Sequence, residues 1–296
     1  VGSEMCIRDR YMINLWYEDS YWAHRQGIVS GPEKVVKNFI KSLDLEGVSY
    51  SINQEKYDIN FLMQYDANAH RKHENFEHKS CYIGPQFWGW DAYGKFLFDN
   101  PNYYNKLITP SEWVSNQVIT QFNVPSNKVV SWPVGIDIVN VDKEIEYDFL
   151  IYFKRRSDNE LNLIKKFLDE RGMTYIIFGY GNYSQNDFIN TLSKVRFAFL
   201  LNGTESQGIA VQEILASATP CLVWDVKEWN DMGEEWVTPA TSVPYWSNEC
   251  GELFYKYPEL GDTFSKFISN NYNPQEFVKR ELSLKASLNK FMEIIV

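Results

Sequence analysis

The stretch that decides the fold is "LLNGTESQGIAVQEILASATPCLVWD", residues 200–225. It begins with an apolar run, turns through small polar residues, continues as a helix-like segment and closes on a second apolar run. A strand, a helix and a strand in this order are typical of a βαβ unit in a parallel sheet. Two acids, Glu205 and Glu213, flank the start of the helical segment. The first question is whether they share a task or belong to an ordinary charged helix face.

The same alternation runs along the whole chain and predicts an α/β protein. We expect strands at residues 11–17, 48–52, 59–65, 81–84, 106–109, 128–132, 147–153, 174–179, 197–202 and 220–224. We expect helices at 31–43, 111–122, 158–172, 186–195 and 205–218, and one long closing helix over 274–296. Ser30 and Ser111 precede two of these segments and are expected to cap them.

The rhythm breaks once, in "WPVGIDIVNVDKEIEY" at 132–147, which we interpret as a linker. The domains predicted from it are a non-native leader (1–10), an N-terminal Rossmann-like domain (11–138), a C-terminal Rossmann-like domain (139–273) and the closing helix (274–296). The leader lacks the apolar core of a signal peptide. The expected architecture is therefore two α/β domains in series, with their parallel sheets facing a central cleft.

Composition excludes several classes of function. The formal net charge of −10 disfavours nucleic acid and anionic membrane surfaces as partners. No apolar run approaches the roughly 18–20 residues of a transmembrane helix. The four cysteines are widely spread without a CxxC pair, which favours a reducing, cytoplasmic location.

The acids at 205 and 213 gain meaning from their context. With 39 acidic residues in the chain, a pair at this spacing is expected by chance. These two, however, flank a helix start that follows a buried-looking strand, at the edge where ligands of parallel α/β folds bind. Gly208 lets an anion approach the backbone closely, and the N–H groups of a helix start favour a phosphate. Carboxylates accept hydrogen bonds from sugar hydroxyls. The pattern therefore indicates a phosphate site with a hydroxyl-binding acid on either side.

The segment "GTESQGIAVQEILASATPCLVWD" resembles the E-x7-E region of glycosyltransferase family 4, within the GT-B glycosyltransferases. Two further segments extend the resemblance over most of the chain from about Ile13. "LITPSEWVSNQVITQFNVPSNKVVSWPVGID" is similar to the end of that family's first domain, and "GIVSGPEKVVKNFIKSL" to its first loop and helix. Val134 replaces the usual Asn before Gly135, and Ser217 opens "SATP" where the family has "CGTP".

The resemblance implies a set of donor-binding residues. Glu205 matches the acid that contacts the donor sugar, and Glu213 the acid that binds the ribose. The expected donor site comprises Lys154, Arg155, Gly179, Gly181, Glu205, Ser206, Gln207, Gly208, Ile209 and Glu213. The family's Lys after its Arg has no counterpart, because acidic and amide residues fill 158–160. A solvated strand-end cluster is the alternative for the two cations.

The acceptor side is expected in the first domain. Asp66 and His70 follow the strand at 59–65, so either of them, together with Glu205, is a candidate for the catalytic groups. His24 and Gly31 fall in the first loop and helix and are expected to face the acceptor. Each of these residues has an ordinary structural role as its alternative.

Metal chemistry is the competing signal. His70, His73, His78 and Cys81 have spacings compatible with zinc, but they match no common zinc motif, and we expect no metal. No Asp-x-Asp and no GxxxxGK[ST] occurs, which disfavours metal-dependent GT-A transferases and P-loop nucleotidases.

The sequence thus predicts a glycosyltransferase that moves a sugar from a UDP- or GDP-sugar to an acceptor hydroxyl, without a cofactor. The acceptor class (glycan, lipid-linked or small molecule) stays open, and retention of configuration is implied by the resemblance. A non-hydrolysing sugar-nucleotide epimerase and a non-catalytic nucleotide- or sugar-binding module remain as alternatives.

Overall fold

The structure is a computed structural model that describes residues 12–18, 30–54, 58–73 (backbone only at 73), 80–87, 89, 91–229 and 237–295. Its described residues form two compact units. Unit 1 contains the described residues up to Gly135 together with those from Leu284 onward, and unit 2 contains the described residues of Ile136–Ser283.

Unit 1 is built on a six-stranded sheet in the order β2-β1-β3-β4-β5-β6. All its neighbouring strands pair in parallel. The strands are β1 (Ile13–Trp16), β2 (Tyr50–Ile52), β3 (Ile59–Gln64), β4 (Ser80–Gln86), β5 (Lys106–Thr109) and β6 (Val129–Ser131). The central strand β3 is buried along its whole length, as expected for a parallel sheet covered on both faces.

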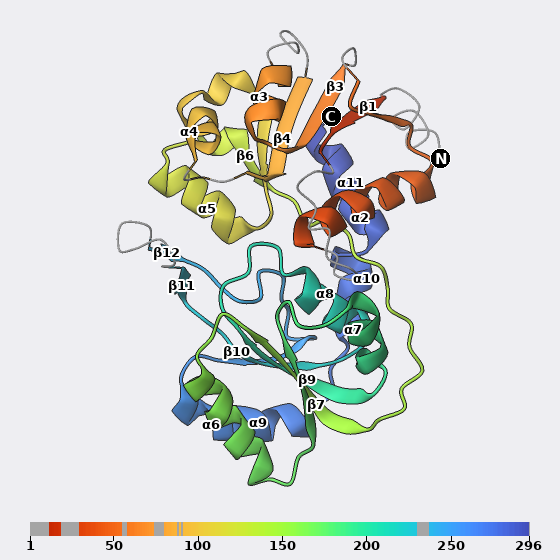
Figure 1. Cartoon of the computed structure of the whole chain (residues 1–296), viewed down its shortest axis with the longest axis vertical. Coiled ribbons are helices and arrows are strands. Elements are labelled where there is room, and N and C mark those ends of the chain that lie inside the picture. Colours follow the sequence, from red (N-terminus) through yellow and green to blue (C-terminus); the bar gives the residue numbers. More distant parts are fainter. Residues whose placement is uncertain are drawn as a thin grey trace. The chain divides into compact units, whose positions relative to one another are not determined.

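Helices cover both faces of this sheet (Figure 1). They are α2 (Gly31–Glu46), α3 (Ala67–His73), α4 (Ala92–Asp99), α5 (Glu112–Gln121) and α11 (Leu284–Ile295), with 3-10 turns at Pro101–Tyr103 and Ser126–Lys128. The Ser30 hydroxyl accepts a hydrogen bond from the Glu33 N–H and so caps α2 as predicted. Ser111 occupies the N-cap position of α5, but its side chain makes no capping hydrogen bond there.

The end of the chain forms two helices where the sequence predicts one. Helix α10 (Pro274–Glu281) belongs to unit 2, whereas α11 belongs to unit 1. The helix stops because the Leu282 carbonyl accepts a hydrogen bond from the Ile136 N–H, and Ser283 forms a β-bridge with Ile136. These long-range backbone contacts replace the continuation of the helix.

Helix α11 is anchored in unit 1 by an aromatic cluster and two hydrogen bonds. Phe291 packs on Phe39 and Phe61 with ring centroids 4.6 and 4.7 Å apart. The Trp132 indole N–H donates to the Ser287 carbonyl at 3.0 Å, and the Ser287 hydroxyl donates to the Pro133 carbonyl at 2.6 Å. The last helix therefore completes the core of the unit in which the chain begins.

Unit 2 has a five-stranded parallel sheet in the order β13-β10-β9-β7-β8. Its strands are β7 (Tyr147–Lys154), β8 (Tyr175–Gly179), β9 (Val195–Asn202), β10 (Cys221–Trp224) and β13 (Gly251–Phe254), with a small antiparallel pair β11 (Glu228–Trp229) and β12 (Thr238–Pro239). Its helices are α6 (Asp158–Asp169), α7 (Gln185–Leu192), α8 (Ile209–Ala216), α9 (Leu260–Ser269) and α10, with a 3-10 turn at Tyr257–Glu259.

Helices α6 and α9 cover one face of the second sheet, and α7 and α8 the other (Figure 1). On the face covered by α6 and α9, Phe149 and Phe199 of the sheet join Phe264 and Phe267 of α9 in one buried cluster. The ends of β7, β9 and β10 are thereby held at one edge of a rigid sheet.

Three cysteines lie in these cores as free thiols. Burial raises the pKa of Cys250 to about 12, and it also raises the pKa of Cys81 and of Cys221. A thiol reacts as the thiolate, so these groups are inert in the folded protein. We expect iodoacetamide at pH 8 to leave all three unmodified in native protein and to modify all three in urea, as read by peptide mass spectrometry. Native labelling of any of them contradicts the packing described.

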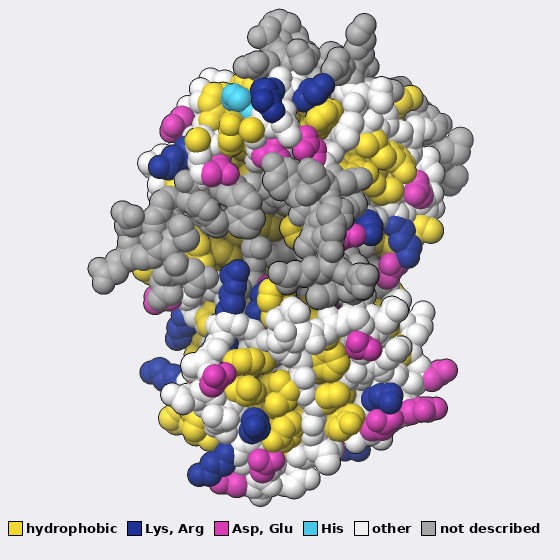
Figure 2. Space-filling view, in the orientation of Figure 1, with side chains coloured by type: hydrophobic (Ala, Val, Ile, Leu, Met, Phe, Trp, Pro, Cys, Tyr) yellow, Lys and Arg dark blue, Asp and Glu magenta, His cyan; other side chains and the backbone are white. Residues whose placement is uncertain are grey.

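Among the described residues, no helix combines the length and the apolarity needed to cross a membrane. On the face seen in Figure 2, described Lys and Arg side chains are interspersed with Asp and Glu side chains.

Candidate functional site

Three strands of unit 2 end side by side and deliver polar side chains to one edge of the sheet. Lys154 ends β7 and pairs in register with Asn202, which ends β9. Asp225 directly follows β10. Parallel strands bring their carboxyl ends to the same edge, so residues far apart in the chain gather there. The Gly203 N–H then donates to the Lys154 carbonyl at 2.8 Å, which starts the loop toward α8 beside the end of β7.

The centre of this edge is an ion pair between Lys154 and Glu205. The Lys154 ammonium donates to both carboxylate oxygens of Glu205 at 2.8 Å. Their side chains are only 14% and 10% exposed, so water screens this pair less than it screens a surface pair. The ammonium also lies 4.4 Å from the centroid of the Tyr180 ring, whose outer part is exposed to solvent. A buried carboxylate, a cation and an open aromatic ring are thus brought together.

The loop after Glu205 turns into α8 through Gly208. This glycine has φ +72°, a left-handed conformation that side chains disfavour. Gln207 and Ile209 on either side are buried, whereas Ser206 is exposed. The Gln212 amide donates to the Gln207 carbonyl at 3.0 Å and holds the turn from within the helix. The positive end of the α8 dipole therefore begins next to Glu205.

Glu213 lies one turn further along α8, 6% exposed. One of its carboxylate oxygens accepts a hydrogen bond from the Gln185 amide at the start of α7, at 2.8 Å. Burial raises the pKa of Tyr183 to about 12, and the Glu213 charge adds to the rise, so this phenol stays protonated at neutral pH. Glu213 is thus a buried acid on α8, held by the Gln185 amide at the start of α7.

Comparison with solved structures places this arrangement in a known architecture. The chain is similar to the apo form of the lipopolysaccharide outer core galactosyltransferase WaaB, with 12% identity, TM-score 0.57 and coverage of 96% of this chain and 98% of that one. It is similar to a glycosyltransferase from Rickettsia africae, with 13% identity, TM-score 0.58 and coverage of 97% and 98%. The fold is GT-B.

A third similar structure is the sucrose-phosphate synthase from Thermosynechococcus elongatus, with 10% identity, TM-score 0.54 and coverage of 96% of this chain and 98% of that one. No family model and no curated protein matches the sequence. Similarity at these identities shows the GT-B fold, and the site has to be argued from this chain's own residues.

The other predicted donor residues of this GT-B chain lie at the same sheet edge. Arg155 is exposed and has φ +53°, and its backbone passes close to Gly203, where an added Cβ would lie 3.1 Å from the Arg155 carbonyl oxygen. Gly179 ends β8, and Gly181, with φ +80°, forms the turn after it. Arg156 instead donates hydrogen bonds to the Glu160 carboxylate and to the Trp224 carbonyl, and so has a structural role.

The predicted acceptor-side residues lie in unit 1 and have structural partners there. The Asp66 carboxylate accepts from the N–H groups of Asn68 and Ala69 and so caps α3. His70 hydrogen-bonds the Tyr65 hydroxyl at 2.8 Å, and its ring centroid lies 4.5 Å from that of Phe96. These contacts give both residues a structural role, and their catalytic role stays a prediction.

Two further residues were expected near the acceptor. Gly31 begins α2, and no atom of the described residues lies within 4 Å of where its Cβ would stand. His24 lies outside the described residues.

The histidine-rich segment begins as helix α3, which Asp66 caps. Cys81 is buried within β4. The described part of the chain contains no group of three or more His, Cys, Asp or Glu residues placed to hold a metal. The side chain of His73 and the whole of His78 lie outside it.

Three site residues escaped the sequence reasoning, namely Asn202, Asp225 and Tyr180. Asn202 and Asp225 stand at the ends of buried strands, and this position could have drawn attention to them. Tyr180 stands between the two predicted glycines, but only the fold places its ring over the Lys154 ammonium.

Proposed function

We propose that this protein is a glycosyltransferase that moves a sugar from a UDP- or GDP-sugar to an acceptor hydroxyl. The observation that carries the proposal is the buried Lys154–Glu205 pair beside the Gly208 turn, at the carboxyl edge of the second sheet. The cation and the backbone N–H groups suit a diphosphate, and the carboxylate suits a sugar hydroxyl. Two of the similar GT-B structures are a galactosyltransferase and a glycosyltransferase, which supports the same reaction class.

Each residue has a distinct task in this proposal. The N–H groups of the Gly208 turn and the side chains of Lys154 and Arg155 stabilise the charge that develops on the departing diphosphate. Glu205 accepts hydrogen bonds from the sugar, and Glu213 from the ribose. Gly179 and Gly181 leave room for the base beside the end of β8.

We assign acceptor binding to unit 1 and propose a reaction that retains the anomeric configuration and needs no metal. Support for metal independence comes from the positive groups that the chain itself supplies at the phosphate position. Transfer in excess EDTA tests this point, and proton NMR of the first product formed tests the configuration. The buried free thiols support a reducing, cytoplasmic location.

A thermal-shift panel of UDP, GDP, ADP and their sugars tests the proposal. At about 100 times its dissociation constant, a ligand stabilises the folded protein by about 2.7 kcal/mol, which raises the melting temperature by several degrees. We expect one nucleotide series to do so. Glu213→Ala should remove most of the shift, because the variant loses the acceptor for the ribose hydroxyls.

Glu252→Ala is the matched control. Glu252, on β13, is another carboxylate of unit 2 and forms an ion pair with Lys266 at 2.7 Å. Its loss should leave the nucleotide-induced rise in melting temperature intact. If no nucleotide stabilises the wild type, the proposal fails. Binding without turnover over a broad acceptor panel favours the binding module, and epimerised donor in the absence of acceptor favours the epimerase.

A further inference from the structure

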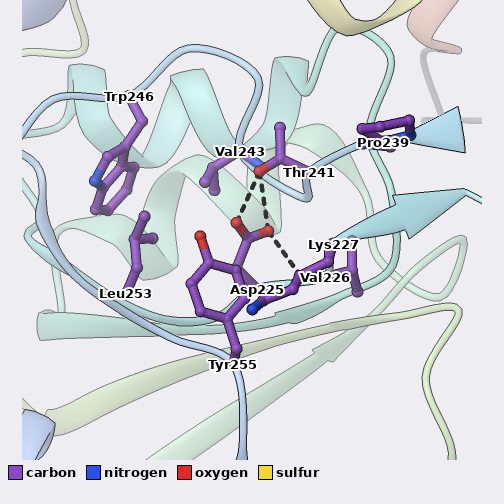
Figure 3. A pocket seen from close by; sticks show the side chains of 10 residues that line it. Asp225, Val226, Lys227, Pro239, Thr241, Val243, Trp246, Leu253 and Tyr255 are labelled. Atoms are coloured by element: carbon purple, nitrogen blue, oxygen red, sulfur yellow. Dashed lines mark hydrogen bonds between the residues drawn. The ribbon is translucent and has the colours of Figure 1, made fainter.

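The Asp225 carboxylate is an anchor for a segment that the site depends on. One of its oxygens accepts from the N–H and the hydroxyl of Ser242, at 2.7 and 2.8 Å, and from the Val226 N–H at 2.8 Å. The Thr241 hydroxyl donates to both carboxylate oxygens, at 2.9 and 3.0 Å. Asp225 is only 5% exposed, and in Figure 3 its carboxylate points at Thr241.

The anchored segment holds the Glu205 loop through its carbonyl groups. The Thr241 carbonyl accepts from the Glu205 N–H at 3.1 Å. The Ser242 carbonyl accepts from the Asn202 side-chain amide at 3.0 Å. That amide also lies 3.5 Å from a carboxylate oxygen of Glu205. Asp225 is therefore connected to Glu205 by two short hydrogen-bonded routes, one through the backbone and one through Asn202.

The environment of Asn202 indicates that its side chain serves to link Ser242 to Glu205. The side-chain nitrogen of Asn202 faces two acceptors, the Ser242 carbonyl and the Glu205 carboxylate, and this fixes which way the amide is oriented. Its amide oxygen is buried, and none of the described residues donates to it. A buried polar atom without a partner has a cost in stability. Asn202 is fully buried in spite of this cost. The stabilising contacts of its side chain are therefore those of the nitrogen, with Ser242 and Glu205.

We propose that Asp225 is a positioning residue that fixes the Glu205 carboxylate for the sugar of the donor, acting through Thr241, Ser242 and Asn202. The inference rests on the proposed function and adds a residue to it. Asp225 also lines an open hollow of about 490 Å³ with Thr241, Trp246 and Tyr255 (Figure 3). Direct contact with a ligand in that hollow is the competing role. The two roles differ in whether the effect of Asp225 depends on Glu205.

A double-mutant cycle measures that dependence. The dissociation constants of the nucleoside diphosphate and of the nucleotide sugar are determined by calorimetry, with UDP and UDP-glucose or GDP and GDP-mannose as the panel directs. The quantity compared between variants is the dissociation constant of the nucleotide sugar divided by that of the nucleoside diphosphate. Asp225→Ala should raise this ratio about tenfold in the wild type and less than twofold in Glu205→Gln, because the carboxylate that it positions is then gone. Affinity for the diphosphate alone should change less than threefold.

Asp225→Asn provides a second variant, since it keeps the shape and one acceptor oxygen. It should raise the ratio about threefold, with the same dependence on Glu205, and it guards against a variant that fails to fold. Asp148→Ala is the control, because Asp148 ties β7 to Thr174 in the same manner at the opposite edge of the sheet. It should lower the melting temperature without changing the ratio.

The outcomes separate the two proposals. A ratio that rises equally in both backgrounds, or that does not rise with Asp225→Ala, overturns the positioning role while leaving the transferase proposal in place. Absence of any nucleotide binding by the wild type overturns both.

Discussion

Glu205→Gln is expected to lower the rate of sugar transfer on the order of 100-fold or more while binding of the nucleoside diphosphate is kept or improved. Loss of a single preorganised group that acts on the reacting centre typically has an effect of this size. The opposite effect on the diphosphate follows from the ion pair. In the structure Lys154 donates to both oxygens of Glu205. A phosphate has to compete with that carboxylate for the ammonium.

Glutamine has nearly the same shape and no charge, so it holds Lys154 less strongly. We expect diphosphate affinity to rise by about threefold to tenfold, which corresponds to roughly 1 kcal/mol of competing interaction removed. Turnover of the nucleotide sugar and calorimetric titration with the diphosphate measure the two effects separately.

Glu160→Gln is the matched control for this experiment. Glu160 also pairs with a cation that follows β7, Arg156, but this pair ties α6 to the sheet. Its loss should affect stability and leave the ratio of turnover to diphosphate affinity unchanged. A Glu205→Gln variant with normal turnover, or with diphosphate binding lost together with turnover, contradicts the roles assigned to the pair.

Gly251→Ala should destabilise unit 2 by at least about 3 kcal/mol, which lowers the melting temperature by on the order of 10 °C. Gly251 begins β13 with φ +143°, a conformation that side chains rarely adopt. A Cβ built there would stand 1.8 Å from the carbonyl oxygen of Cys221 on the neighbouring strand β10. The contact is with the backbone of β10, the strand next to the edge strand β13, so the pairing of these two strands has to shift.

Gly261→Ala is the control for the glycine substitution. Gly261 lies in α9, where no atom from the described part of the chain comes within 4 Å of an added Cβ. Alanine at a helical position is favoured over glycine by about 0.5–1 kcal/mol, so the melting temperature should stay constant or rise slightly. Circular dichroism of both variants checks the pair of expectations. A Gly251→Ala protein as stable as the wild type contradicts the register of β10 and β13.

Local sequence patterns determined much of this protein. The apolar runs and helical periods predicted the α/β class, because burial of a strand or of one helix face leaves its mark on adjacent residues. The start of α2 followed from Ser30, since a cap acts within one turn. The stretch at 200–225 predicted a strand followed by a helix over 205–218, and Glu213 does lie on α8. The helix begins only at Ile209, after the Gly208 turn, so Glu205 lies in the loop between β9 and α8.

What only the tertiary structure decided are the contacts between residues far apart in the chain. Lys154 and Glu205 were assigned to different parts of a donor, and the register of β7 with β9 brings them into a direct ion pair. Asp225 received no role until the fold set Thr241 and Ser242 against it. The predicted closing helix is interrupted because the Ile136 N–H donates to the Leu282 carbonyl and Ile136 forms a β-bridge with Ser283. Propensity and capping act over a few residues, whereas strand register and backbone pairing are set by the packing of the whole chain, so no local pattern records them.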